Sequence, residues 1–442
     1  MKSSEFLIAY GIEEGDYVEI ETKDGLKVEG LVMPKFSKRE DVLVLKLNNG
    51  YNIGLLVNRI KSMRKLKKAE RGQPGSPVPL LEKVEEGDKR VLIIGCGGTI
   101  ASRIDYETGA VKAYLSPEEL KLSVPEMFAY ASIDAESFFS ILSEDMKPNM
   151  WSAIVEKVAD AISKGYDGVV VTHGTDTMSY TSAALAFAFH KGLPVPIVLT
   201  GAQRSSDRPS SDSAFNLTAS TLAAARAPFA EVVVVMHGET GDTYALAHRG
   251  VRVRKMHTSR RDAFQSINAL PLAKIWPYEG KIEIIDPRFR KRGEQELVYE
   301  NGFDERVVLI KHFPGNVADV IDALVDKGVH GIVIEGTGFG HISSDAISAV
   351  RRAIENNIPV VAASQTIFGR VNLNVYSTGR KMLEVGVIPA EDMLAEVAYV
   401  KLSWALARTR DLKEIRRLML TNLVGEISSR HYVDLFPRWN HG

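Results

Sequence analysis

One short segment of this 442-residue chain carries side chains capable of nucleophilic chemistry. Thr175 and Asp176 closely follow the apolar run Val169–Val171, with Gly174 in between. A continuous β-branched run is typical of a parallel strand that is covered on both faces. Ligands sit outside the carboxyl ends of such strands in open α/β sheets. We therefore expect the two polar side chains at the edge of a binding site, followed by an Ala-rich helix over Thr181–Phe189.

A second segment of the same design lies upstream. The apolar residues Val91–Ile94 lead into the glycine-rich stretch Gly95–Gly98 and then to Thr99. Glycine lets the backbone bend and lets a ligand approach closely, so this strand tip suggests a second nucleophilic hydroxyl. The segment lacks the third glycine of the dinucleotide fingerprint and the Lys-Ser/Thr of a phosphate-binding loop. By itself it favours no particular function.

Alternating apolar runs and Ala-rich stretches predict the elements that hold these segments. They indicate an α/β body with parallel sheets covered on both faces, built from two domains, 89–300 with the active site and 301–425. The connector 271–302 contains two short strand-like pieces, and residues 426–442 form a tail. The predicted strands are Val91–Gly95, Val169–Thr172, Ile197–Thr200 and Val232–His237 in the first domain, and Val307–Lys311, Gly331–Glu335 and Pro359–Ser364 in the second.

Residues 1–72 predict a separate small domain. Four or five short alternating segments, with turn sequences at Lys23–Gly25 and Asn48–Gly50, indicate an SH3-like or Sm-like β-barrel. A basic run at its end either binds nucleic-acid phosphates or forms a solvated face, and the second is more usual. The run comprises Lys61, Arg64, Lys65, Lys67, Lys68 and Arg71. Residues 73–88 predict an exposed linker.

Composition restricts the class of protein. The chain has 55 Lys and Arg against 56 Asp and Glu, whereas a protein that binds nucleic acid by itself is usually more basic. The single cysteine, Cys96, excludes an internal disulfide and suits a reducing compartment. No stretch is typical of a signal peptide or approaches the roughly 20 apolar residues of a membrane span. We expect a cytoplasmic protein with no membrane association.

Several motifs, in the same order along the chain, resemble those of the bacterial-type L-asparaginase family. Gly97–Ala101 and Thr172–Met178 resemble its pair of signatures, and the resemblance covers roughly residues 89–425. The further motifs are Ser143–Met146, Leu199–Gln203 with Ser211–Asn216, Glu335–His341, Gly369–Asn372 and Asn374–Gly379. The resemblance implies a two-domain asparaginase-like body that hydrolyses a carboxamide.

The small barrel in front and an amphipathic helix at Asp411–Asn422 make the chain similar to the D-subunit family of the archaeal glutamyl-tRNA(Gln) amidotransferases. In that family the subunit hydrolyses L-glutamine, and the ammonia passes to an E subunit that phosphorylates and amidates Glu on misacylated tRNA. The resemblance implies an E-subunit partner, Glu-tRNA(Gln) bound through the complex, and a homodimer within a heterotetramer. It implies ATP and Mg²⁺ for the partner and no cofactor on this chain.

The resemblance also implies catalytic roles. Thr99 and Thr175 match the nucleophile and the water activator, and Asp176 accepts from the α-ammonium of the substrate. The family places a lysine with the second threonine, and Lys255 matches it. The adjacent Arg254 is a poorer match because arginine cannot give up a proton in proteins. The surrounding arginines are expected on a solvated basic loop; these are Arg249, Arg252, Arg260 and Arg261.

Substrate-binding groups are expected beside these residues. The Ser143 hydroxyl and the backbone N–H groups of Gly98 and Gly174 can hold the α-carboxylate. Glu144 stands where the family often has Gln. Ser143 can alternatively cap the helix that enters at Asp145–Trp151, and the two roles are compatible.

One segment departs from the asparaginase pattern, and the histidines are not expected to take part in the chemistry. The family's lid tyrosine is replaced by Gly109–Lys112, with Tyr106 and Tyr114 on either side. Either tyrosine substitutes, or the lid is completed only when a partner docks. His173 is expected to be a buried hydrogen-bonding residue rather than a base, and the histidine spacing predicts no zinc site.

Two other functions remain open from the sequence. A free-standing L-asparaginase would turn over asparagine rapidly without a partner. A non-catalytic tRNA-binding scaffold would use the barrel and the basic run, but it would need none of the four residues Thr99, Thr175, Asp176 and Lys255.

Overall fold

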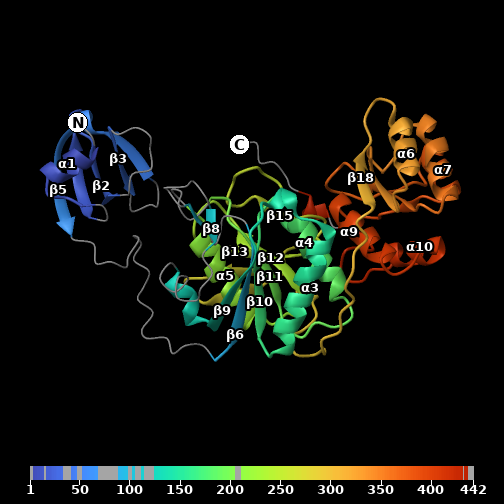
Figure 1. The fold of residues 1–442 in the computed structure, drawn as a ribbon, viewed down its shortest axis with the longest axis horizontal. Helices are drawn as coiled ribbons and strands as arrows, with labels where there is room; N and C mark the ends of the chain where they lie inside the picture. Colours follow the sequence, from blue (N-terminus) through green and yellow to red (C-terminus); the bar gives the residue numbers. More distant parts are fainter. Residues whose placement is uncertain are drawn as a thin grey trace. The chain divides into compact units, whose positions relative to one another are not determined.

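The computed structural model describes residues 3–13, 16–32, 41–46, 52–67, 88–97, 102–104, 111–113, 124–204, 211–431 and 433–436 (Figure 1). The chain divides into two compact units. The small unit comprises Met1–Glu85 with Arg204–Ser211, and the large unit comprises Glu86–Gln203 and Asp212–Gly442. No helix among the described residues is both long and apolar enough to cross a membrane.

The small unit is an antiparallel sheet with a short helix. Its strands follow the order β4-β3-β2-β1-β5, so the last strand returns to pair with the first. The elements are α1 (Ser3–Ala9), β1 (Tyr17–Thr22), β2 (Lys27–Val32), β3 (Val42–Lys46), β4 (Asn52–Leu56), η1 (Val57–Arg59) and β5 (Ile60–Lys67). Phe6 and Leu7 of α1 join Val18, Ile20 and Leu45 of the strands in one core. The predicted small β-rich region is confirmed, whereas α1 was not predicted.

Part of the predicted basic run lies on strand β5 and is paired with acidic residues of the small unit. Lys61 Nζ lies 2.6 Å from Glu21 Oε1, and Arg64 lies 3.2 Å from Glu19. Lys65 forms an ion pair with Asp16. These contacts favour the solvated-face interpretation for this part of the run. The side chain of Lys67, and all of Lys68 and Arg71, lie outside the described residues.

The N-terminal half of the large unit (residues 88–302) contains an eight-stranded sheet in the order β17-β16-β13-β12-β11-β10-β6-β9. The five strands from β12 to β9 are parallel. The predicted strand-like pieces of the connector are β16 and β17, which extend the sheet in antiparallel orientation. The strands are β6 (Arg90–Cys96), β9 (Ser132–Phe139), β10 (Gly168–Thr172), β11 (Ile197–Thr200), β12 (Val232–His237), β13 (Ala245–Arg249), β16 (Ala273–Trp276) and β17 (Lys281–Ile284).

Helices cover both faces of this sheet. Because side chains alternate along a strand, Val169 and Val171 of β10 pack into one core and Val170 into the other. Helices α3 (Pro148–Ser163) and α4 (Met178–Ala188) contribute to the first core, and α5 (Ser213–Arg226) contributes to the second. Short pieces complete this half; they are β7 (Ser102–Ile104), β8 (Val111–Ala113), η2 (Pro125–Ala129), η3 (Ser143–Asp145), β14 (Val253–Lys255) and β15 (Phe264–Ser266).

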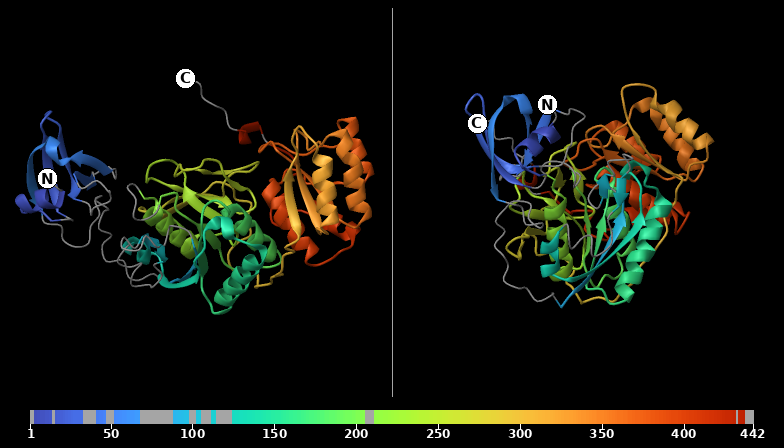
Figure 2. Two further views of the ribbon diagram at one scale, coloured as in Figure 1. Left: turned by 45° about the horizontal axis from the view of Figure 1, so that its top comes forward. Right: turned by 60° about the vertical axis from the view of Figure 1, so that its left-hand side comes forward.

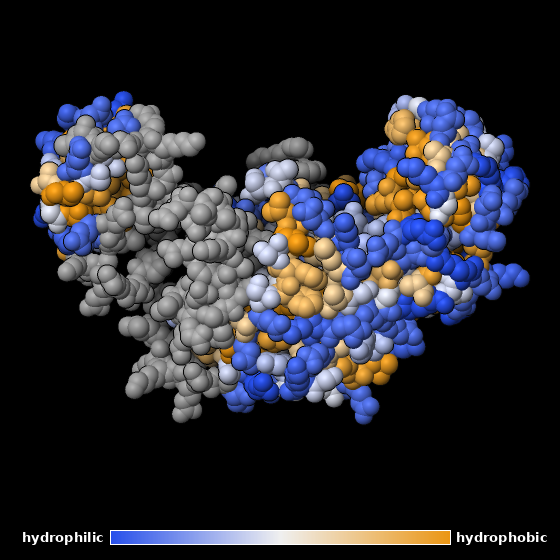
Figure 3. Space-filling view, viewed as in Figure 1, coloured by the Kyte–Doolittle hydropathy of each residue, from blue (hydrophilic) through white to orange (hydrophobic). Residues whose placement is uncertain are grey.

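The C-terminal half of the large unit (residues 303–436) has a four-stranded parallel sheet, β18-β19-β20-β21. Helix α9 belongs to the same apolar core as α4, so the two halves share one continuous core; Figure 2 shows the ribbon of both halves from two further sides. The elements are β18 (Val307–Lys311), α6 (Val317–Asp326), β19 (Gly331–Gly336), η4 (Ser344–Ala346), α7 (Ile347–Glu355), β20 (Val360–Ser364), α8 (Ser377–Glu384), β21 (Ile388–Pro389), α9 (Ala395–Leu406), α10 (Leu412–Leu420) and η5 (Val433–Leu435). Hydrophilic residues cover most of the visible described surface, with smaller hydrophobic areas between them (Figure 3).

Candidate active site

The candidate site lies at the carboxyl end of β10. This strand is buried along its whole length. Thr172 at its end is in register with Gly95 of β6 and Thr200 of β11, so three parallel strands end at the same edge of the sheet. The chain then turns, and Thr175 and Asp176 follow before α4 begins at Met178. Thr175 is buried, whereas the Asp176 side chain is 66% exposed.

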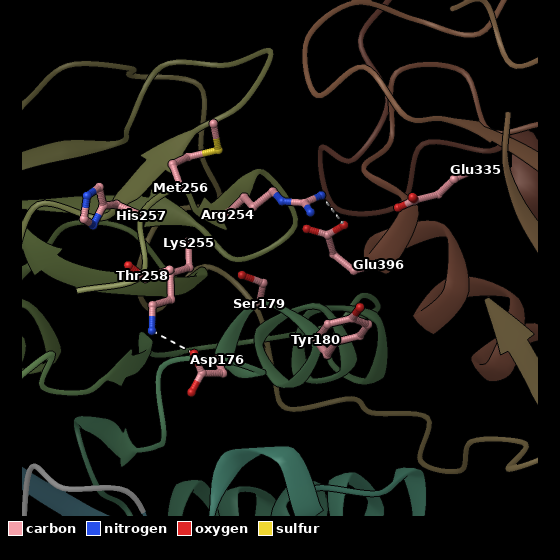
Figure 4. A pocket seen from close by; sticks show the side chains of 10 residues that line it. All are labelled: Asp176, Ser179, Tyr180, Arg254, Lys255, Met256, His257, Thr258, Glu335 and Glu396. Atoms are coloured by element: carbon pink, nitrogen blue, oxygen red, sulfur yellow. Dashed lines mark hydrogen bonds and ion pairs between the residues drawn. The ribbon is translucent and has the colours of Figure 1, made fainter. Parts of the chain in front are cut away.

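Strand β14 brings Lys255 to this strand tip. Its Nζ lies 2.8 Å from Thr175 Oγ1 and 2.8 Å from Asp176 Oδ1 (Figure 4). The Lys255 side chain is only 14% exposed. The structure therefore brings together three of the predicted catalytic residues, although Lys255 lies 80 positions from Thr175 and 79 from Asp176 in the sequence.

Ser143 approaches the constellation from η3. Its Oγ donates to Asp176 Oδ2 over 3.3 Å, and its backbone carbonyl accepts from Thr177 Oγ1 at 2.7 Å. A Cβ on Gly174 would lie 2.5 Å from Ser143 Cβ, so only glycine permits this approach. The alternative that Ser143 caps the following helix is wrong, because α3 begins at Pro148 with Lys147 at its N-cap position.

The structure gives no test of the roles predicted for the other site residues. Glu144 is exposed within η3. Gly98 and Thr99 lie outside the described residues, as do Tyr106 and Tyr114. Their roles at the nucleophile and in the lid stay predictions.

Electrostatics keep Asp176 ionised. The hydrogen bond from Lys255 is the largest influence and lowers the pKa of Asp176 below its usual value. Partial burial opposes this shift, while the Lys255 charge and the Ser143 hydroxyl add to it. Asp176 is therefore a carboxylate at neutral pH and can accept hydrogen bonds from a substrate ammonium.

His173 is a structural residue of the same turn. Its Nδ1 lies 2.7 Å from the Gly174 carbonyl, and its Nε2 lies 2.9 Å from Thr181 Oγ1. Burial lowers the pKa of His173 to about 4. The neutral ring thus donates from Nδ1 to the carbonyl and accepts at Nε2 from the hydroxyl, which confirms the expected buried hydrogen-bonding role.

A cavity of about 370 Å³ adjoins Lys255 and Asp176 and is bounded by both halves of the large unit (Figure 4). On its C-terminal side, Arg254 lies 3.2 Å from Glu396 of α9. Burial raises the pKa of Glu396, and the Arg254 charge offsets only part of this effect. The wall residues are Asp176, Ser179, Tyr180, Arg254, Lys255, Met256, His257, Thr258, Glu335 and Glu396.

The expected solvated basic loop is partly wrong. Arg252 is 2% exposed and pairs with Asp392 at 2.9 Å. The Arg261 side chain is also largely buried and pairs with Asp242 at 2.8 Å, whereas Arg260 is exposed. The buried pairs were missed because their carboxylates come from other elements. The only local signal was the alternation of Arg252 and Arg254 around a buried valine.

Comparisons with known proteins agree with this geometry. Residues 90–289 match the family model described as asparaginase, N-terminal. Residues 306–419 match the glutaminase/asparaginase C-terminal domain, and residues 12–66 match the GatD N-terminal domain.

Curated relatives extend the similarity over nearly the whole chain. The D subunit of the glutamyl-tRNA(Gln) amidotransferase of Aeropyrum pernix is 62% identical over 421 residues, which cover 95% of this chain and 99% of the relative. The corresponding D subunit of Thermococcus kodakarensis is 52% identical over 441 residues, with 99% of each chain covered.

Similar solved structures cover less of the chain. The thermostable L-asparaginase from Thermococcus kodakarensis has a TM-score of 0.70 and 35% identity, and the match covers 77% of this chain and 100% of that chain. L-asparaginase I from Vibrio cholerae has a TM-score of 0.66 and 28% identity, with 77% and 99% covered.

Proposed function

Since the chain belongs to the D-subunit family of the glutamyl-tRNA(Gln) amidotransferases, we propose that it is the glutamine-hydrolysing subunit of that enzyme. It has an asparaginase-type fold over most of its length. Its product ammonia would serve the conversion of Glu-tRNA(Gln) to Gln-tRNA(Gln). The single observation that carries the hydrolytic role is the Thr175–Asp176–Lys255 constellation.

The constellation supplies the proton transfers of amide hydrolysis. In the proposed order of steps, the Thr99 oxygen attacks the side-chain amide carbon of glutamine. The proton of the hydroxyl passes to the amide nitrogen, the C–N bond breaks, and ammonia leaves. Water held by Thr175 then hydrolyses the resulting ester to glutamate. Lys255 Nζ lies 2.8 Å from Thr175 Oγ1, so in its neutral form it can take, through the Thr175 hydroxyl, the proton that the attacking water gives up. The adjacent Asp176 stabilises the ammonium that forms.

The same carboxylate supports substrate recognition. Lys255 and Ser143 each bond to one Asp176 oxygen, but the side chain stays 66% exposed. A carboxylate oxygen has more than one acceptor position, so Asp176 can also accept from the α-ammonium of glutamine. The Ser143 hydroxyl, which donates to Asp176 in the structure, can rotate to donate to the α-carboxylate when glutamine binds.

The relatives are subunits of a multi-subunit enzyme, so this chain works with partner subunits. We assign to an E-type partner the ATP- and Mg²⁺-dependent activation of Glu on the tRNA, and we assign to this chain no cofactor of its own. A homodimer within a heterotetramer is the proposed assembly. The buried single cysteine, Cys96, suits the reducing cytoplasm.

A free-standing L-asparaginase is the second candidate, because the similar solved structures are asparaginases. Those matches cover 77% of this chain, whereas the matches to the amidotransferase relatives cover 95% and 99%. The difference favours the amidotransferase subunit. Rapid asparagine turnover by the purified chain without a partner would favour the asparaginase.

The test replaces Thr175 with valine in the assembled complex. Thr175→Val keeps the side-chain shape but removes the Thr175 hydroxyl that bonds to Lys255 Nζ. Loss of acid–base catalysis typically lowers the rate by about 10²–10⁴-fold. We expect glutamine-dependent amidation to fall by at least about 100-fold. Amidation with added ammonium should stay within about twofold, because ammonia enters after the lost step.

Thr218→Val is the matched control. Thr218 is buried in α5, and its hydroxyl donates to the Ala214 carbonyl at 2.8 Å. The same chemical change there removes a hydroxyl from a helix of the other apolar core, whereas Val253 of β14 belongs to the first, and it should leave both reactions intact. Near-normal glutamine hydrolysis by Thr175→Val would show that the constellation is not the hydrolytic site.

A further inference from the structure

Along Arg252 and strand β14, alternate side chains contact different parts of the large unit. Residues two apart on a strand point to the same face. Val253 is buried and Lys255 reaches the strand tip of β10. Arg252 and Arg254 instead bond to carboxylates of the C-terminal half. The strand that carries Lys255 is thus tied on one face to the active site and on the other to the neighbouring half.

The two carboxylates lie four positions apart in the sequence, Asp392 in the turn before α9 and Glu396 in the first turn of that helix. Arg252 Nη1 donates to Asp392 Oδ2 at 2.9 Å, and Arg254 Nη1 donates to Glu396 Oε2 at 3.2 Å. Both carboxylates are buried. Burial alone raises the pKa of Asp392, but the Arg252 charge and several hydrogen bonds outweigh it, so that this pKa lies below its usual value. The Arg252–Asp392 pair therefore stays charged at neutral pH.

The C-terminal tail closes the network around Arg252. Arg252 Nε donates to the Gly425 carbonyl at 2.8 Å, and Nη2 donates to Ser428 Oγ at 2.8 Å. The Ser428 backbone N–H donates to Asp392 Oδ1 at 2.9 Å. The tail segment Gly425–Ser428 lies beyond residues 306–419, where the C-terminal family model ends. A planar guanidinium with several donors is suited to holding three such partners at once.

The hairpin that carries Lys255 is exposed at its turn and buried again where it returns to the core. Strands β14 and β15 share three residue pairs; residues 256–260 between them are exposed, whereas Ala263 and Phe264 are buried. Lysine has a long flexible side chain, so the position of its Nζ depends on where the backbone is held. Catalytic groups must lie within about 0.5 Å of their productive positions. Arg252, directly before β14, fixes the beginning of the strand through three partners, whereas Arg254 adds one contact to Glu396.

We propose that Arg252 is a positioning residue for amide hydrolysis: by tying β14 to Asp392 and to the tail segment Gly425–Ser428, it holds Lys255 Nζ at the Thr175 hydroxyl. Arg252 is not among the residues that line the cavity, so it acts through Lys255. The proposal rests on the proposed function. It extends the hydrolytic machinery to a tail more than 170 residues away in the sequence.

The test is Arg252→Lys in the full-length chain within the assembled complex. Lysine keeps a cation for Asp392, but a single ammonium cannot reproduce the fork that also reaches Gly425 and Ser428. A displacement of about 1 Å in a catalytic group can cost about 10²-fold in rate. We expect kcat for glutamine to fall about 10-fold to 100-fold, while KM and ammonia-dependent amidation stay within about twofold.

Ser428→Ala is a milder variant that leaves the Arg252–Asp392 pair in place. It removes one acceptor of the guanidinium and should lower kcat by about threefold without changing KM, since it loosens one of the ties. Should Arg252→Lys fail to fold, this variant alone decides the question, with unchanged kcat counting against the proposal.

Arg290→Lys is the matched control for general destabilisation. Arg290 is also largely buried; it lies 3.7 Å from Glu231 and donates to the Phe189 carbonyl at 3.1 Å. The kcat of this variant per folded molecule should be unchanged. The proposal is overturned if Arg252→Lys and Ser428→Ala keep normal kcat, or if their kcat falls no more than that of Arg290→Lys. Absence of glutamine hydrolysis in the unaltered complex would instead refute the proposed function.

Discussion

Two shielded lysines of the large unit should respond in opposite ways to the same substitution. Lys255 is 14% exposed and bonds to an Asp176 side chain that is 66% exposed. Lys401 of α9 and its partner Glu426 are both 0% exposed, with Nζ and Oε1 2.6 Å apart. Methionine can replace either alkyl stem but not the ammonium. Lys255→Met and Lys401→Met therefore separate a catalytic from a structural use of a lysine.

The magnitudes follow from what each substitution leaves behind. In Lys255→Met, water can solvate Asp176, and exposed ion pairs contribute only about 0–1 kcal/mol. Stability should change little, while glutamine hydrolysis should fall by about 10²–10⁴. In Lys401→Met, the Glu426 carboxylate stays buried, although the Leu423 and Val424 N–H groups still donate to it. Breaking a buried pair on one side costs about 3–5 kcal/mol.

Denaturant unfolding of the chain and initial rates of glutamate release measure the two effects. Rates are expressed per folded molecule, and ammonia-dependent amidation reports whether the complex assembles. Lys401→Met should unfold at lower denaturant but keep most of its rate per folded molecule, because the Leu423 and Val424 N–H groups still hold Glu426 within the tail segment. The reasoning fails if Lys255→Met destabilises the chain as strongly as Lys401→Met does, or if it retains most of its glutaminase rate.

Three further predictions concern coupling, the small unit and pH. The isolated chain should be a poor glutaminase, and a partner with Glu-tRNA should activate it. The reason is that the family's lid tyrosine is missing at Gly109–Lys112 and that lid closure completes many active sites. Equal glutaminase rates with and without partner and tRNA would contradict this. Deleting residues 1–75 should leave a folded large unit that loses tRNA-stimulated turnover or complex stability more than basal hydrolysis, and a full tRNA response would exclude the small unit from coupling. Burial lowers the pKa of His173 to about 4 and that of His248 to about 3, so below about pH 6.5 the unfolded histidines bind protons that the folded ones do not, and stability falls with pH. Between about pH 6.5 and pH 5, the free energy of unfolding in urea should therefore fall by about 2 kcal/mol less for His248→Gln than for the parent chain. An unchanged pH dependence would contradict this role of His248.

The central strands were predictable because they consist of consecutive apolar residues. Val169 and Val171 face one core while Val170 faces the other, and a strand covered on both faces needs apolar residues throughout. The antiparallel strands at one end of the sheet carry less of this signal. Strands β16 and β17 were predicted only as short pieces of a connector, since their place in the sheet depends on pairing with β13. Helix α1 was missed because its apolar residues pack on strands of the small unit.

The site was predictable where a local motif carries it. Thr175 and Asp176 follow a strand directly, and the asparaginase resemblance supplied Lys255. Arg252 had no such signal and was expected on a solvated loop. It is buried because Asp392, 140 positions away, compensates its charge. A pattern within a few residues cannot show a partner at that distance, so burial of charged residues is the part of this site that required coordinates.

The arrangement of β14 also changes how the predicted division of labour between the two halves should be understood. The sequence placed the active site within residues 89–300, and Thr175, Asp176 and Lys255 do lie there. However, Arg252 and Arg254 on either side of Val253 take their counter-charges from the C-terminal half, and α9 shares a core with α4, which follows Asp176 directly. Both the threonine turn and the lysine strand are therefore packed against the C-terminal half. In the proposed mechanism, the geometry of proton transfer therefore depends on the whole large unit rather than only on the half that contributes Thr175, Asp176 and Lys255.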